Sequence, residues 1–81
     1  MQMYSKAIAK RIIELCKERR ITINKLATLS GITQSTLNNI IKCNSKNPSI
    51  RTLQRIASGL GMSVSQLLDF PELSDAMFED D

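Results

Sequence analysis

Small amide and hydroxyl side chains line one side of residues 33–42, and their spacing suits hydrogen bonding to another molecule. The apolar residues Leu37, Ile40 and Ile41 recur at helical spacing and mark the buried side of a short helix. At about 100° per residue, the opposite side carries Ser35, Asn38, Asn39 and Lys42, with Gln34 at its N-terminal end. Amide side chains can bond N6 and N7 of adenine together, so the pattern favours a surface that reads the edges of DNA bases.

Polar residues on an exposed helix face are usually only solvated, and that is the alternative interpretation. Asn, Ser and Thr are, however, poor helix formers. A face selected only for stability would more often carry Glu, Lys, Gln or Ala. We therefore interpret the amides and hydroxyls of this face as groups selected for what they contact.

Residues 23–30 form the element that must hold this helix in place. Ile23, Leu26 and Ala27 follow the i, i+3, i+4 pattern of an amphipathic helix. Gly31 can adopt a positive φ without a Cβ penalty, and so allows a sharp turn between the two helices. Thr33 is placed to cap the second of them, because its hydroxyl can accept a hydrogen bond from a free backbone N–H. The unit is a predicted helix-turn-helix.

The same periodicity predicts three further helices. The first spans about residues 5–20. The fourth begins after Ser49 and ends near Gly61, and a short fifth begins at a capping box formed by Ser63 and Gln66. The predicted fold is therefore all-α, with five helices in one folded domain over residues 1–69.

The helix-turn-helix resembles that of the Cro/CI-type (XRE-like) family of bacterial and phage regulators. The residues that carry the resemblance are Leu26, Ala27, Gly31, Ile32, Ser35, Thr36, Leu37 and Ile40. Flanking segments extend it over about residues 6–69, in the order of the family's five helices. The resemblance implies a compact lambda-repressor-like domain, in a sequence-specific double-stranded DNA-binding transcriptional regulator. It also implies a repressor that binds as a homodimer.

In this family the third helix enters the major groove and the second crosses the DNA backbone. Carried onto matching positions, this predicts base contacts from Thr33, Gln34, Ser35, Asn38 and Asn39. Phosphate contacts are predicted from Asn24, Lys25, Thr36, Lys42, Lys46, Asn47 and Arg51. Many family members carry Gln where this chain has Ile23, so that contact is missing and Asn24 is the candidate replacement. Because the base-contacting set contains no Arg, we expect adenine contacts to outnumber guanine contacts.

Charge is divided unevenly along the chain. All 11 Lys and Arg residues lie within residues 1–68, where Glu14 and Glu18 are the only acids, so this body carries +9. Residues 69–81 contain six acids and no base, or −6, which leaves a total of +3. A basic body suits a phosphate backbone. On the first helix, we interpret the cations as a solvated flank that steers association at long range: Lys6, Lys10, Arg11, Lys17, Arg19 and Arg20.

Residues 70–81 are predicted to form an acidic C-terminal tail in one of two states. A disordered acidic end is the first interpretation. The second is a short amphipathic helix, because Phe70, Leu73 and Met77 are spaced for one face and Pro71 suits a first helical turn. Such a helix could bind a second copy or an unrelated protein partner, or compete with DNA for the basic body.

Other function classes find little support in the sequence. The chain has no His, no Gly-rich phosphate loop and no convincing carboxylate pair in its body, so we predict no enzyme activity, metal or cofactor. Cys16 and Cys43 are interpreted as reduced, small hydrophobic residues. The lack of a long apolar run or a signal-like N-terminus predicts a cytoplasmic protein without membrane contact. The main competing hypothesis is a protein-interaction module of the same fold, antitoxin-like or partner-binding, with weak or no specific DNA binding.

Overall fold

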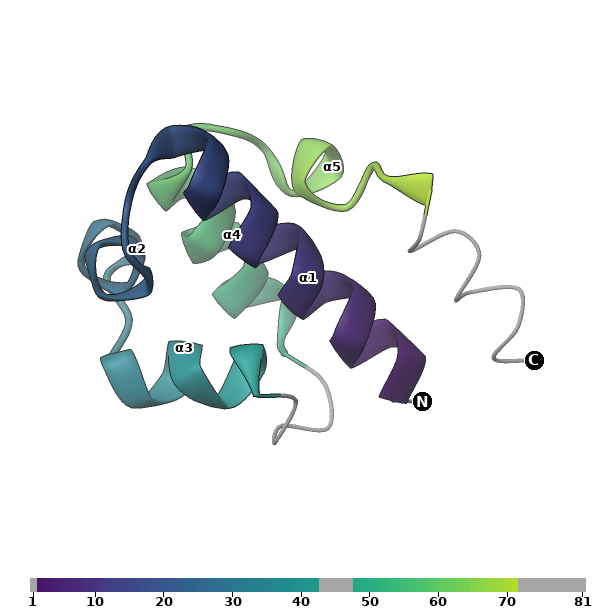
Figure 1. Cartoon of the computed structure of the whole chain (residues 1–81), viewed down its shortest axis with the longest axis horizontal. Coiled ribbons are helices and arrows are strands. Elements are labelled where there is room, and N and C mark those ends of the chain that lie inside the picture. The colour runs from purple at the N-terminus through teal and green to yellow at the C-terminus, as the bar shows by residue number, and fades with distance from the viewer. Residues whose placement is uncertain (1, 43–47, 72–81) are drawn as a thin grey trace.

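The structure is a computed structural model (Figure 1). The part of the chain that it describes contains five helices. They are α1 (Gln2–Arg19), α2 (Ile23–Ser30), α3 (Gln34–Ile41), α4 (Ile50–Gly59) and α5 (Val64–Leu67). The backbone is described for residues 2–42 and 48–71, and side chains for residues 6–42 and 48–71. The predicted helix order is confirmed, although α1 begins at residue 2 rather than near residue 5.

Hydroxyl side chains mark the start of every described helix after α1. Each accepts a hydrogen bond from a backbone N–H of the first turn, and these N-caps are Thr22, Thr33, Ser49 and Ser63. At α5 the predicted capping box is complete, because Gln66 Oε1 also accepts from the backbone N–H of Ser63 at 2.9 Å. Such a cap stabilises a helix by about 1 kcal/mol, which explains why these short helices begin where they do.

Both α1 and α2 end at a residue with a positive φ. Gly31 closes α2 at φ 68°, as predicted, and its backbone N–H donates to the preceding turn. Arg20 closes α1 at φ 56°, a conformation that costs a residue with a side chain about 1 kcal/mol or more. The N–H of Ile21 then donates to the carbonyl of Cys16 at 3.0 Å, which completes the hydrogen bonding at this end of α1.

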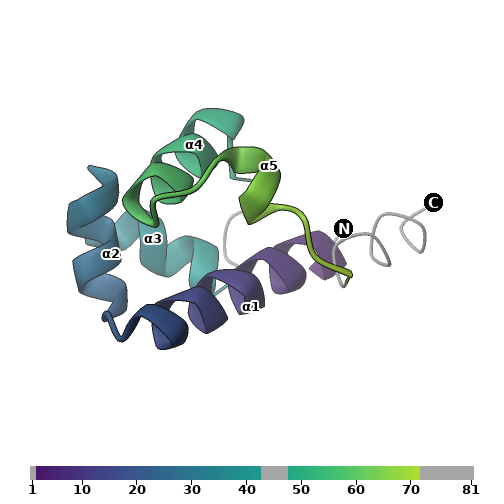
Figure 2. The same cartoon turned by 90° about the horizontal axis from the view of Figure 1, so that it is seen from above.

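One large, fully buried side chain from each helix meets in a single core. In order from α1 to α5 these are Ile12, Leu26, Leu37, Ile56 and Leu67. Burial of an aliphatic side chain of this size contributes about 1.5 to 3 kcal/mol. Figures 1 and 2 show α1 crossing the bundle between α3 and α5, while α4 lies behind α1 and packs on α2. The core therefore fixes the orientation of α3.

The crossing of α2 and α4 depends on Ser30 and Gly59. Ala27 is buried on α2, and the closest approach of α2 to α4 lies at its end. A Cβ atom at Gly59 would lie 2.4 Å from Ser30 Oγ and 3.1 Å from the backbone N of Ser30. Ser30 Oγ is buried and has no hydrogen-bond partner among the described residues. The pair is a close packing contact that only glycine permits.

The assignment of Arg11 to the solvated basic flank is wrong. Its guanidinium donates hydrogen bonds to the carbonyls of Leu67 and Gln66, both at 3.3 Å, and lies 5.4 Å from the centroid of the Phe70 ring. These carbonyls belong to the last turn of α5, where carbonyl oxygens lack regular intrahelical donors. Phe70, which we assigned to the tail, is 7% exposed and belongs to the core. Arg11 therefore joins α1 to α5 and covers Phe70.

Candidate nucleic-acid interface

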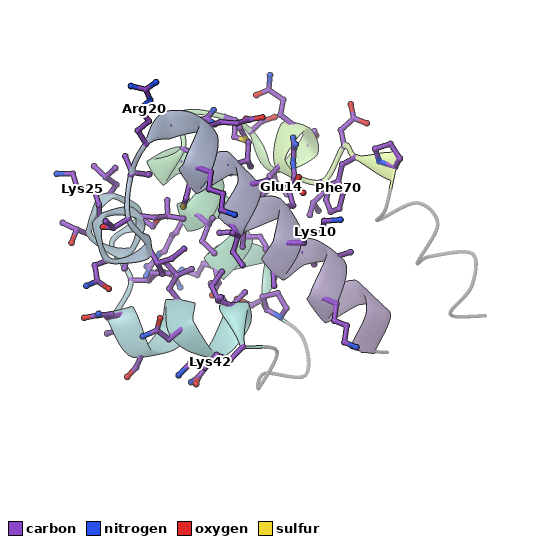
Figure 3. All side chains as sticks on the ribbon, viewed as in Figure 1. Lys10, Glu14, Arg20, Lys25, Lys42 and Phe70 are labelled. Atoms are coloured by element: carbon purple, nitrogen blue, oxygen red, sulfur yellow. The ribbon has the colours of Figure 1, made fainter. Side chains whose placement is uncertain are left out.

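The polar side of α3 is exposed, and Figure 3 shows its polar side chains on the side that faces away from α1. Leu37 and Ile40 are buried in the core. The residues predicted to contact bases lie from the N-cap to the second turn of the helix: Thr33, Gln34, Ser35 and Asn39 are exposed, and Asn38 is half-buried. This arrangement presents amides and hydroxyls in one row.

Thr33 and Thr36 form a hydroxyl pair at the start of this row. Thr33 Oγ1 accepts from the backbone N–H of Thr36 at 3.1 Å, and the two hydroxyl oxygens lie 2.8 Å apart. Because one hydroxyl hydrogen serves the pair, the other stays free to donate outward. Thr33 is thus both the predicted N-cap and, through the pair, a source of one donor for a base or phosphate oxygen.

Gln34 is linked across the turn to α2. Its Nε2 donates to Asn24 Oδ1. An amide nitrogen has two hydrogens, so this bond leaves Gln34 one N–H donor and its carbonyl oxygen. Those two groups are the complement of N7 and N6 of adenine. The contact with Asn24 therefore links Gln34 to α2 and leaves Gln34 one donor and one acceptor.

Asn24, which we predict as a phosphate ligand in place of the missing family glutamine, also accepts a hydrogen bond from Gln34. The neighbouring Ile23 is half-buried and packs against the core, which explains why it cannot serve a polar contact. The Oδ1 of Asn24 is taken by Gln34, but its side-chain N–H groups remain available to a phosphate. The sequence patterns did not predict the Asn24–Gln34 pair. The signal that could have indicated it is that both residues lie in the first turns of consecutive helices.

Three of the predicted phosphate ligands are exposed cations on α2, α3 and α4. Lys25 lies in the first turn of α2, Lys42 is the C-cap of α3, and Arg51 lies in the first turn of α4. None of the three forms an ion pair with another described residue, and Figure 3 shows Lys25 beside α2 and Lys42 at the C-terminal end of α3. Two further predicted phosphate ligands, Asn24 and Thr36, are exposed on α2 and α3. The last two, Lys46 and Asn47, lie outside the described residues.

No carboxylate opposes these cations along the chain. Residues 19–68 contain no Asp and no Glu, so α2 and α4 contribute only positive formal charge, while α3 and α5 carry no charged side chain. The described carboxylates are Glu14 and Glu18 on α1 and Asp69 after α5. A surface built from residues 19–68 therefore has a positive potential that attracts a polyanion.

A family model of the Cro/C1-type helix-turn-helix DNA-binding domain matches residues 11–72. The chain belongs to this family. Its predicted fold class, family and role as a DNA-binding transcription regulator are thereby confirmed. No described helix of this regulator is long and apolar enough to cross a membrane.

Two relatives come from Bacillus subtilis (strain 168). The SPbeta prophage-derived uncharacterized HTH-type transcriptional regulator YopS is 39% identical over 59 residues, which cover 73% of this chain and 80% of YopS. The HTH-type transcriptional regulator SinR is 36% identical over 62 residues, which cover 76% of this chain but 56% of SinR. The match thus spans about four fifths of one relative and about half of the other.

Solved structures share the arrangement of helices. The prophage Lp1 protein 11 has a TM-score of 0.75 with 37% identity, over 83% of this chain and 88% of that one. A chain of the SinR/SinI complex has a TM-score of 0.69 with 29% identity, over 90% of this chain and 76% of that one. The five-helix fold of the regulator is therefore shared with proteins of its family.

Cys16 is buried in the core of the regulator, with 3% exposure. Burial raises the pKa of its thiol, and the nearby Arg19 lowers it by a smaller amount. A thiol in such surroundings packs as a small hydrophobic group, as we predicted for this residue. Cys43 lies outside the described residues. Among the described residues, no group of three or more His, Cys, Asp or Glu side chains could hold a metal ion.

Proposed function

We propose that this regulator is a repressor that binds a two-fold symmetric site in duplex DNA as a homodimer, with α3 in the major groove. The observation that carries the proposal is the exposed row of amides and hydroxyls on α3. Cations flank that row in a stretch of chain without carboxylates. This combination supports both base reading and neutralisation of phosphates.

Base contacts in the proposal centre on Gln34. Bonded to Asn24, it keeps one N–H donor and its carbonyl acceptor, the two kinds of group that a bidentate contact with adenine uses. Asn39 supplies a second exposed amide, and Asn38, Ser35 and Thr33 complete the set. A good bidentate amide contact contributes about 1 to 3 kcal/mol of discrimination between bases. The preferred half-site is therefore expected to contain adenine at the positions that these amides contact.

Phosphate contacts are proposed for the groups around the row. Lys42 and Lys46 are the strongest candidates, with Lys25, Arg51, Asn24, Thr36 and Asn47 beside them. Neutralisation of one phosphate releases counterions, so loss of one such lysine lowers the slope of log K against log salt by about 0.9. Lys42→Ala should thus weaken binding to all sequences alike.

Selection of bound sequences from a random duplex library tests the proposal. We expect a symmetric site whose half-sites lie about one helical turn, or about 34 Å, apart, with adenine in each half. Gln34→Ala should relax the preference at one adenine position. The matched control is Gln54→Ala, which removes an exposed amide from α4 and should leave the preference intact. A core of G·C pairs alone, unchanged by Gln34→Ala, contradicts the proposed reading.

Binding of a protein partner is a second candidate function, because the structurally similar SinR chain comes from a complex with SinI. A partner-binding module would show no salt-dependent selection of DNA sequence. The library experiment therefore separates the two functions, since only the first yields an enriched site.

A further inference from the structure

Three lysines form a row along α1, on the side of the helix that faces away from the core. Lys6, Lys10 and Lys17 are all exposed, and at about 100° per residue they fall within about 40° of one another around the helix. The fully buried Ile12 lies about 140° from the middle of this group. None of the three forms an ion pair with another described residue, and none belongs to the proposed DNA contacts. We call them the lysine row.

The chain that follows α5 arrives beside the lysine row. Pro71, the last described residue, lines a pocket of about 200 Å³ together with Lys10. Phe70 lines the same pocket and is buried under Arg11 of α1. Figure 3 shows Lys10 and Phe70 close together beside α1. The point from which residues 72–81 continue therefore lies next to the lysine row.

The ten residues that follow Pro71 are long enough to reach the whole lysine row. Along the axis of α1, Lys6 lies about 6 Å from Lys10 and Lys17 lies about 10.5 Å from it, at 1.5 Å per residue. Ten residues span about 15 Å as a helix and about 33 Å when extended. Each lysine of the row is therefore within reach, whichever of these two conformations the segment adopts.

The charge of residues 72–81 is opposite to that of the lysine row. The segment lies outside the described residues, and its sequence contains five carboxylates and no base. An exposed ion pair contributes only about 0 to 1 kcal/mol, so a stable contact needs several pairs at once. Three lysines on one side of α1 and five carboxylates in ten residues provide for several pairs. The carboxylates are Glu72, Asp75, Glu79, Asp80 and Asp81.

The attachment at Pro71 favours the lysine row of the same chain over that of a second copy. A segment joined to a short chain meets a nearby site at an effective concentration on the order of millimolar. A second copy at micromolar concentration offers the same acidic segment about a thousandfold more dilute. Weak surface ion pairs therefore form within one chain first.

We propose that residues 72–81 lie along the lysine row of their own chain and exclude polyanions from this side of α1. Residues 1–18 carry four basic and two acidic side chains, or +2, so the five carboxylates change this side to −3. Residues 19–68 keep seven basic side chains, or +7. The two sides of the molecule then have opposite sign, and DNA is directed to α2, α3 and α4. The contact itself forms without DNA.

Amide NMR spectra of the full chain without DNA test the contact. The amide variant replaces the five carboxylates of residues 72–81: Glu72→Gln, Asp75→Asn, Glu79→Gln, Asp80→Asn and Asp81→Asn. We expect the backbone signals of Lys6, Lys10 and Lys17 to shift between wild type and this variant, and that of Lys42 to stay in place. The differences should be the same at low and high protein concentration. Unchanged signals on α1, or differences that appear only at high concentration, overturn the proposal.

The salt dependence of binding to a duplex of random sequence tests the exclusion. If the amide variant frees three lysines for phosphates, the slope of log K against log salt should steepen by up to about 2.7, at about 0.9 for each lysine. Fluorescence anisotropy measures this slope, and circular dichroism checks the fold. An unchanged slope in the amide variant contradicts the exclusion.

Two triple variants separate a contact with the lysine row from a general effect of net charge. In one, the row itself is neutral, and the five amide substitutions should then leave the slope unchanged. In the other, three exposed cations elsewhere are neutral, and the five substitutions should still steepen the slope. Equal steepening in both backgrounds overturns the proposal. Failure of sequence selection would not affect this result, because the duplex is random. The first variant carries Lys6→Gln, Lys10→Gln and Lys17→Gln, and the second carries Arg19→Gln, Arg20→Gln and Arg55→Gln.

Discussion

The α2–α3 turn and the α1–α5 junction use polar hydrogen bonds in opposite ways. At the turn, Gln34 donates to Asn24 while both side chains stay exposed, so part of each amide still faces outward. At the junction, Arg11 donates to two backbone carbonyls and lies over Phe70. The charged side chain thus stabilises the fold, and the neutral amide stays exposed for the proposed DNA contact. Formal charge alone does not identify which residue contacts DNA.

Phe70→Ala should break the junction with the largest effect on stability. Removal of a buried aromatic ring costs about 3 kcal/mol, through lost burial and the cavity that remains. Urea unfolding followed by circular dichroism measures this loss. DNA affinity per folded molecule should stay at the wild-type value, because the junction lies away from α3.

Ile50→Ala is the matched control for Phe70→Ala. Ile50 is 62% exposed, so truncation of its side chain should change the free energy of unfolding by less than about 0.5 kcal/mol. Equal losses in the two variants would contradict the role assigned to the junction.

Gln34→Ala should weaken DNA binding and leave stability almost unchanged, which is the reverse of the expectation for Phe70→Ala. We expect a loss of about 1 to 3 kcal/mol in binding to the selected site, with almost no change in unfolding, because the side chain is exposed. Fluorescence anisotropy with a labelled duplex measures the affinity. A double-mutant cycle with Asn24→Ala should give a coupling free energy clearly different from zero, whereas additive losses would show that the two amides act independently.

Arg11→Met should lower stability by about 1.5 kcal/mol, because it keeps much of the aliphatic stem but removes two charge-assisted hydrogen bonds and the contact with Phe70. Thermal unfolding measures the loss. Lys10→Met removes an exposed cation from the same helix and should be nearly neutral. If both substitutions were neutral, Arg11 would belong to the solvated flank after all.

The positive-φ positions Gly31 and Arg20 should show the smallest changes in the free energy of unfolding. Gly31→Ala should lower it, and Arg20→Gly should raise it. A Cβ at Gly31 would meet no atom within 4 Å, so alanine there costs only the left-handed backbone, about 1 kcal/mol. Arg20→Gly removes the cost of the same left-handed conformation in the folded state. Glycine also raises the conformational entropy of the unfolded chain, so the net stabilisation should be only about 0.5 kcal/mol. Chemical denaturation of the two variants, side by side, checks both signs.

Most of the local structure could be predicted from short-range patterns. The four hydroxyl caps, Gly31 and the complete capping box at Ser63 are decided by residues within a few positions of one another. The stripes of Leu26, Leu37 and Ile56 identify buried faces because helical periodicity is local as well. The exposed row on α3 follows directly from those stripes.

Contacts between distant residues could not be predicted in this way. Arg11 meets the carbonyl of Leu67 across 56 positions, and nothing in the neighbourhood of either residue indicates the pair. The approach of Gly59 to Ser30 likewise depends on how two helices cross. Phe70 was assigned to the tail because it precedes an acidic stretch, yet its burial depends on Arg11 and α1. Such features require the three-dimensional arrangement.

The bond between Gln34 and Asn24 has a consequence for the thermodynamics of recognition. A free glutamine side chain loses about 1.5 to 2 kcal/mol of rotamer entropy when it is immobilised. Because Asn24 already holds Gln34 in the unbound protein, that loss is incurred during folding rather than during association. The association entropy should therefore become less favourable in Asn24→Ala, even where the enthalpy of the proposed adenine contact is retained.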